Sequence, residues 1–333
     1  MQLFVDESGD FNIRSGRLRF NVVAGLALPE SPAVVMELVA RQIVELEERA
    51  PLSWRSNGEL KGALIPTDDL RQTLGPILSI SGPVFVVAAF IDQSYQERGQ
   101  IAEYRTARLT GLEREKQAET APERQAELAD EIRFVRRASE VVLMRSYVAL
   151  PKVVINAIVL MQAYYPPEFW SALERLEVIV DRDSFLGNHL SRHRVVKQRI
   201  VEELEMHATR WGFEELHQWH DRGLPHPVER LEAYPGSHRS WPINLDYDLN
   251  ADAAGRPLVV LGDLVAAAIR RDLEVATGTN ASPPIVCIER RMFPVLTGLG
   301  KLSDAEQRKA RAALEPLWAA WGVRFSNDAN VQQ

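Results

Sequence analysis

Residues 3–28, LFVDESGDFNIRSGRLRFNVVAGLAL, carry the pattern that decides the fold. Two apolar runs flank a polar segment that contains the turn signal Ser15-Gly16, and the second run ends before Pro29. Apolar runs separated by such a turn are typical of an antiparallel β-hairpin. We therefore predict that the chain opens with a hairpin whose first strand carries an acid, Asp6, near its end.

Two further apolar runs predict buried strands. VFVVAAFI at 84–91 is rich in β-branched and aromatic residues, and RLEVIVDRD at 175–183 is an apolar run that also finishes in acid. A helix is expected after the hairpin, because Ser31 and Pro32 provide a helix start signal. Residues 51–58 are expected to form a loop.

The second half of the chain is predicted to be mainly helical, with one long irregular stretch. Pro151 interrupts a strongly apolar helical region at 141–165. Residues 221–256 are rich in Pro, Gly, His and Asp, and their length favours a functional loop over a plain connection. The other expected elements are helices at 191–211 and 257–273, a possible strand at 213–220 and a short strand near 285–288.

Residues 96–137 have a different composition from the rest of the chain. Glu, Lys, Arg, Ala and Gln dominate there, and large apolar residues are few. This composition predicts a helical insertion that projects from the main body without a tight core, with Pro122 near the start of its second helix. The insertion separates an N-terminal part of the core at 1–95 from the remainder at 138–333.

The overall composition excludes several classes of protein. With 46 acidic and 39 basic residues the net charge is −7, which argues against general electrostatic binding of nucleic acid but leaves a local basic surface open. The lone Cys287 favours a reducing compartment. The acidic N-terminus is unlike a signal peptide, and the longest apolar run, 153–165, is shorter than the roughly 20 residues of a membrane helix. We expect a cytoplasmic protein with no membrane partner.

Three carboxylates stand where apolar residues would be expected. Asp6 and Asp181 end strands, and Asp263 lies inside an apolar helix, where an uncompensated acid costs several kcal/mol. Oxygen ligands from three separate segments would form a site for Mg²⁺ or Mn²⁺. Each acid alone also fits a structural role, as the cap of a turn or, for Asp263, as the ion-pair partner of Arg270 or Arg271.

Four motifs together give the chain a family resemblance: FVDESGDF at 4–11, ELK at 59–61, IVDRD at 179–183 and LGDLVAAAIRR at 261–271. They resemble the domain of unknown function 3800 family, which is similar to the RNase H-like, or retroviral-integrase-like, superfamily. The resemblance implies an α/β fold with a mixed central sheet that begins with an antiparallel hairpin and has helices on both faces. The family's late helix usually follows Gln-x-Ala-Asp, whereas this chain has Val-Leu-Gly-Asp.

The resemblance also implies a reaction, that of a metal-dependent nuclease. Asp6, Asp181 and Asp263 would hold two divalent ions, with Glu7 and Asp183 as reserve ligands. Two such ions hydrolyse a phosphodiester bond without a protein nucleophile.

The ELK motif would support the same reaction. Lys61 would orient the attacking water or neutralise charge on the phosphate, and Glu59 would be its partner. In the alternative, these two residues form only an exposed ion pair.

Basic residues close in sequence to the proposed ligands would attract a nucleic acid substrate through its phosphates. The alternative is that they pair with Glu202, Glu203 and Glu205 on neighbouring turns. The candidates are Arg14 and Arg17 in the first hairpin, and Arg192, Arg194, Lys197 and Arg199 in the helix after Asp181.

Three competing functions remain open. Asp181 and Asp183 also fit the DxD motif of haloacid-dehalogenase-like phosphatases, as nucleophile and general acid. A zinc site in the long loop is a weaker candidate, because its histidines have poor ligand spacing; they are His217, His220, His226 and His238, with Asp221. The chain could also be a non-catalytic module that binds nucleic acid or, through the insertion at 96–137, a protein partner.

Overall fold

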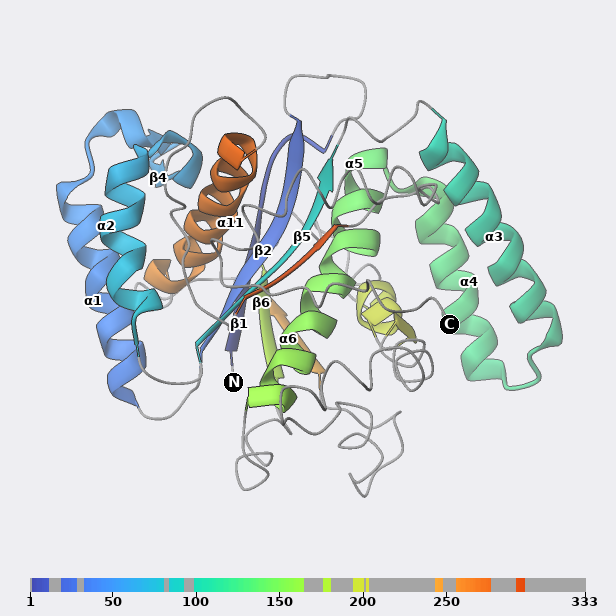
Figure 1. Ribbon diagram of the computed structural model, residues 1–333. Coiled ribbons are helices and arrows are strands. Elements are labelled where there is room, and N and C mark those ends of the chain that lie inside the picture. Colours follow the sequence, from blue (N-terminus) through green and yellow to red (C-terminus); the bar gives the residue numbers. More distant parts are fainter. Residues whose placement is uncertain are drawn as a thin grey trace, which may run out of the picture.

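The computed structural model describes residues 2–11, 19–28, 33–80, 84–92, 99–164, 176–180, 194–200, 202–203, 243–247, 256–276 and 292–296. Six strands form one sheet in the order β7-β6-β1-β2-β5-β8 (Figure 1). They are β1 (Gln2–Ser8), β2 (Phe20–Leu28), β5 (Phe85–Asp92), β6 (Leu176–Val180), β7 (Ile243–Tyr247) and β8 (Met292–Leu296).

The sheet is mixed. β1, β2 and β5 are antiparallel neighbours, which confirms the predicted opening hairpin. β6 runs parallel to β1, β7 runs parallel to β6, and β8 runs parallel to β5. The chain therefore has an α/β fold in which the two strands predicted to end in acid, β1 and β6, lie side by side.

Helices cover both faces of the sheet (Figure 1). One face carries α1 (Ala33–Arg49), α2 (Thr67–Leu78) and α11 (Arg256–Ala276), which share an apolar cluster with alternate strand residues such as Phe4 and Val22. The opposite cluster contains the intervening residues Leu3, Val5 and Val23. This division follows from the two-residue period of a strand, which sends successive side chains to opposite faces.

The second face is covered by a nearly continuous helical segment and by two outer helices. Residues Glu140–Val142 (α5), Leu143–Ala149 (η4, a π-helix) and Leu150–Tyr164 (α6) follow one another, and Pro151 lies in the first turn of α6. A proline at this position is tolerated because its missing N–H is not needed in the first turn of a new helix. The sequence predicted that Pro151 interrupts the helical region. In the structure the α-helical geometry is interrupted by the π-helix that immediately precedes the proline.

The insertion forms two helices, α3 (Gln100–Ala118) and α4 (Pro122–Arg137), as expected. The expectation that it has no tight core was wrong. Leu112, Leu128 and Val135 are fully buried and belong to the apolar cluster of the second face. A few well-placed apolar residues are enough, because ion pairs complete the interface with the main body.

A small hairpin lies between α1 and α2, where the sequence predicted a loop. It comprises η1 (Leu52–Trp54), β3 (Arg55–Ser56), β4 (Glu59–Leu60) and η2 (Gly62–Leu64). Asn57 and Gly58 form its turn with φ values of 54° and 83°. Positive φ at both positions is the requirement of a tight two-residue hairpin turn, and Asn-Gly satisfies it most readily. This dipeptide was the sequence signal for the hairpin.

Two strands of the sheet were not predicted. β7 lies within the stretch expected to be irregular, and β8 follows the expected strand at 285–288, which lies outside the described residues. Five-residue strands at or near sheet edges carry too little pattern to stand out from a Pro- and Gly-rich context. None of the helices in the described part of the chain combines the length and apolar character that crossing a membrane requires.

Candidate functional site

Asp6 lies where Gly262 of α11 packs against β1. A Cβ atom at Gly262 would lie 3.0 Å from the Asp6 backbone nitrogen and 3.2 Å from the Asp6 Cβ. Glycine fits this contact without strain, whereas a larger residue would require the strand or the helix to shift by a few tenths of an ångström. The contact brings Asp263, the next residue on α11, to the end of β1 that carries Asp6.

Asp263 is held by the loop that follows β4. The backbone N–H of Gly62 donates a hydrogen bond of 2.7 Å to Asp263 Oδ2. A Cβ atom at Gly62 would lie 2.8 Å from the Asp263 carbonyl oxygen and 2.9 Å from the Ala267 Cβ. Gly62, the residue after the ELK motif, therefore packs directly against Asp263. The two close glycine contacts lie on either side of the Gly262–Asp263 segment of α11.

The Asp6 carboxyl is buried beside two other acids, Glu7 and Asp263. Burial, the charge of Glu7 and a hydrogen bond with its side chain, and the charge of Asp263 together raise the pKa of Asp6 well above its usual value. The Glu7 backbone N–H, which donates to Asp6 Oδ1 at 2.8 Å, acts in the opposite direction and is outweighed. The charge of Asp263 thus disfavours ionisation of Asp6.

Lys61 supplies a positive charge beside this acid pair. Burial lowers the pKa of Lys61, but a hydrogen bond with Glu59 and the charges of Asp263, Glu59 and Asp6 outweigh it, so that the net pKa is raised. The Lys61 Nζ lies 3.1 Å from Glu59 Oε2, and the side chains of Lys61 and Glu59 are 36% and 72% exposed. Lys61 and Glu59 therefore do form the ion pair that the alternative interpretation expected. The charge of Lys61 also interacts with those of Asp6 and Asp263.

Glu7 points to the opposite face of the sheet from Asp6. Its Oε1 atom lies 2.6 Å from Arg145 Nη1 on the π-helix η4, and both side chains are less than 15% exposed. Glu7 contributes to the site through its backbone N–H, its charge and the side-chain hydrogen bond with Asp6, while its Oε1 atom is paired with Arg145.

Several predicted residues lie outside the described residues: Asp181, Asp183, Arg14, Arg17, Arg192 and the loop histidines. The last described residue of β6 is Val180, and it pairs with Val5, the residue before Asp6. Within the described ranges no group of three or more His, Cys, Asp or Glu side chains is arranged to hold a metal ion. The described part of the site therefore contains two of the three predicted carboxylates.

The basic helix has a different role at its C-terminal end from the one predicted. Arg194 is exposed and Lys197 is partly buried, but Arg199 is only 8% exposed. Its guanidinium contacts Glu203 and also lies 3.4 Å from Glu202. Arg199 thus follows the alternative interpretation, in which basic residues pair with glutamates on the neighbouring turn.

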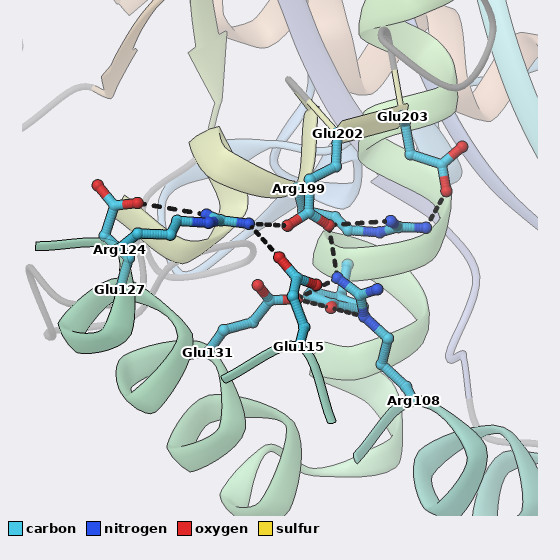
Figure 2. A network of polar contacts seen from close by, with 9 residues as sticks. Arg108, Glu115, Arg124, Glu127, Glu131, Arg199, Glu202 and Glu203 are labelled. Atoms are coloured by element: carbon cyan, nitrogen blue, oxygen red, sulfur yellow. Dashed lines mark hydrogen bonds and ion pairs between the residues drawn. The ribbon is translucent and has the colours of Figure 1, made fainter. Parts of the chain in front are cut away.

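Arg199 belongs to a network of charges that links this helix to the insertion (Figure 2). Arg108 on α3 lies 2.5 Å from both Glu131 and Glu202, and Arg124 on α4 lies 3.2 Å from Glu202. The Tyr147 hydroxyl donates to Glu131 and accepts a bond of 2.6 Å from Arg108 Nε. The network fastens the insertion to the main body; a protein partner for the insertion remains a prediction.

Gly62 and Gly262 belong to the site region but were not predicted as part of it. Arg271 was considered only as a possible ion-pair partner of Asp263, and in the structure it donates instead to the carbonyl oxygens of Gly62 and Ala63. Gly262 had a sequence signal, because glycine inside a helix is unfavourable by roughly 1 kcal/mol relative to alanine and then often marks a close contact. Comparison of the chain with protein-family models, curated proteins and solved structures finds no match.

Proposed function

We propose that this chain is a metal-dependent nuclease that hydrolyses phosphodiester bonds at the site formed by Asp6 and Asp263. One observation carries the proposal: strand β1 and helix α11 bring two carboxylates together, and burial and neighbouring acids raise the pKa of Asp6. A divalent cation would compensate this negative charge and reverse the local sign of the field.

We propose an RNase H-like type for the fold as well. The support is a mixed sheet that opens with the antiparallel β1–β2 pair, continues into the parallel pair β1–β6, and carries helices on both faces. The family resemblance rests on the four sequence motifs.

Mg²⁺ or Mn²⁺ is the cofactor that fits this donor set, because carboxylate oxygens are the ligands these hard ions prefer. Asp6 and Asp263 would hold the ions. Asp181, the residue that follows Val180 at the end of β6, is proposed as the third ligand. Two such ions, when bound, activate a water molecule and stabilise the leaving oxygen of an in-line displacement.

Lys61 has two tasks in this proposal. Its ammonium group attracts the substrate phosphate to an otherwise acidic site, and it stabilises the negative charge that grows on the phosphate oxygens during the reaction. Glu59 restrains the orientation of the ammonium through the 3.1 Å contact. Neither residue forms a covalent bond with the substrate.

The test compares the full chain with Asp6→Asn and Asp263→Asn on single-stranded RNA, single-stranded DNA and an RNA–DNA hybrid, with Mg²⁺ or Mn²⁺. We expect either substitution to lower cleavage by about 1,000-fold, since a bound metal ion contributes several kcal/mol to such a reaction. Asp68→Asn is the matched control, because the Asp68 side chain on α2 is 93% exposed. Unchanged cleavage by both site variants would exclude the proposed mechanism.

A further inference from the structure

Arg271 lies on α11 two turns beyond Asp263 and is tied to the same loop. Its Nη2 atom donates to the carbonyl oxygens of Gly62 at 3.2 Å and Ala63 at 2.9 Å. The Gly62 N–H holds Asp263, so one peptide segment fixes the positions of both the acid and the guanidinium. The two residues are about 12 Å apart along the helix axis, and a long helical side chain points back toward the N-terminus, which shortens this distance.

The Arg271 guanidinium forms no ion pair with a carboxylate among the described residues. Both hydrogen-bond acceptors of its guanidinium are neutral carbonyl oxygens. Its neighbour Arg270 pairs instead with Glu274 at 2.8 Å and donates to the Ser8 hydroxyl at 2.9 Å. Burial and the charge of Arg270 lower the pKa of Arg271, and the charge of Glu274 only partly offsets them.

A rigidly held, partly exposed guanidinium without an acidic partner is suited to an anion. Arginine has five N–H donors, and the contacts of Arg271 with the described residues employ only Nη2. The Nε and Nη1 donors remain, and either can donate a charge-assisted hydrogen bond to one phosphate oxygen. An anion there would also relieve the repulsion between Arg270 and Arg271.

We infer that Arg271 binds a backbone phosphate of the nucleic acid substrate, next to the phosphate that is cleaved at the Asp6–Asp263 site. This inference rests on the proposed nuclease function and adds a substrate contact to it. Phosphates of one strand are spaced about 3.4 Å along a duplex axis, so the contacted phosphate lies within about three nucleotides of the cleaved bond. Arg271 would position the strand without reading its sequence.

The experiment measures binding of a fluorescein-labelled 12-nucleotide strand, as DNA and as RNA, to the full chain over a range of salt concentrations with Mn²⁺ present. An Asp6→Asn background keeps the strand intact. Arg271→Gln should weaken binding by roughly 3- to 10-fold and make the slope of log K against log salt shallower by about 0.7 to 0.9, the value for one lost phosphate contact. Arg271→Lys should retain most of the slope because it keeps the charge.

A phosphate scan locates the contact. Neutral methylphosphonate replaces one phosphate of the strand at a time, and one position should weaken binding to the parent protein but not to Arg271→Gln. Arg133→Gln is the matched control, since the Arg133 side chain is 61% exposed and its helix, α4, packs on the opposite face of the sheet from α11. Inorganic phosphate alone should not shift the melting temperature of the parent chain more than that of Arg271→Gln; a selective shift would assign the site to free phosphate.

The outcomes separate this inference from the function on which it rests. If the strand binds and is cleaved by the unsubstituted chain, but Arg271→Gln keeps the parental salt slope, the inference is wrong and the nuclease proposal stands. If no strand binds or is cleaved under any metal condition, both are wrong. A loss of affinity with an unchanged slope and a lower melting temperature would assign Arg271 only the role of fastening the Gly62 loop.

Discussion

Acidic side chains lie on both faces of the sheet, but their surroundings differ. On the α3 and α4 face, Glu131 is 1% exposed and alternates with Arg108 and other arginines (Figure 2). On the α11 face, the charges of Asp6 and Asp263 act on each other and on Lys61, whose side chain is 36% exposed. Buried acids that are matched by cations within the chain hold elements together, whereas acids left in excess are suited to an external cation.

Removal of Arg108 should have the largest effect on stability. Arg108→Met leaves Glu131 and Glu202 without their shared cation and removes a bond to the Tyr147 hydroxyl, so we expect a loss of about 3–5 kcal/mol. Urea denaturation measures this loss. Arg133→Met is the control, because its exposed pair should contribute about 0–1 kcal/mol. Equal losses in the two variants would mean that the network does not stabilise the fold.

Gly262→Ala tests the close contact on the other face. The added Cβ would meet the Val5 and Asp6 backbone at 3.0 Å, so overpacking should cost about 1–3 kcal/mol, partly offset by the better helix propensity of alanine. Mn²⁺ binding, measured by calorimetry, should weaken because Asp263 moves away from Asp6. Gly111→Ala on α3, where a Cβ meets no atom within 4 Å, should leave Mn²⁺ binding unchanged and raise stability slightly.

The pH dependence of stability, measured with and without Mn²⁺, should distinguish Glu131, which is paired with arginines, from Asp6, which is proposed to bind a metal ion. Burial and the charge of Glu202 raise the pKa of Glu131 above 4.5 and outweigh the opposing effects of Arg108 and Tyr147. The folded state then binds this proton more tightly than the unfolded state, so stability falls as the pH rises from about 4.5 through the raised pKa. Glu131→Gln should flatten this part of the stability profile, measured by thermal unfolding.

Asp6→Asn supplies the second arm of that measurement. The raised pKa of Asp6 gives a slope of the same sign, beginning at its usual value of 3.8. Mn²⁺ should suppress the Asp6 contribution because it binds the ionised carboxylate, and it should leave the Glu131 contribution in place. A metal effect on the Glu131 contribution would contradict the division between the two faces.

The smallest effect is expected for Glu59→Gln. The Glu59 side chain is 72% exposed, so loss of its ion pair with Lys61 should change stability by less than about 1 kcal/mol. Substrate cleavage should fall only a few-fold, because Lys61 keeps its charge near Asp6 and Asp263. A loss as large as that of Asp6→Asn would mean that Glu59 acts in the reaction itself.

Local sequence patterns were enough to predict the principal elements of the fold. Apolar runs bounded by Ser15-Gly16 and Pro29 predicted β1 and β2, and the β-branched runs predicted β5 and β6. Continuous apolar runs of this length are typical of strands that are buried within a sheet. The sequence also singled out Asp6 and Asp263, since an acid within an apolar pattern is costly unless something compensates it. The short strands β7 and β8 and the packing of the insertion lacked a comparable local pattern.

Which charged side chains contact one another follows from the packing of the elements and could not be predicted from local patterns. Arg199 and Lys61 are both basic residues near predicted ligands, yet Arg199 is buried among glutamates and Lys61 faces Asp6 and Asp263. Periodicity records which face of an element is apolar, but contacts between residues 200 positions apart depend on how closely the elements pack. Here two glycines, Gly62 and Gly262, set those distances, because a missing Cβ allows backbones to approach where any other residue would keep them apart.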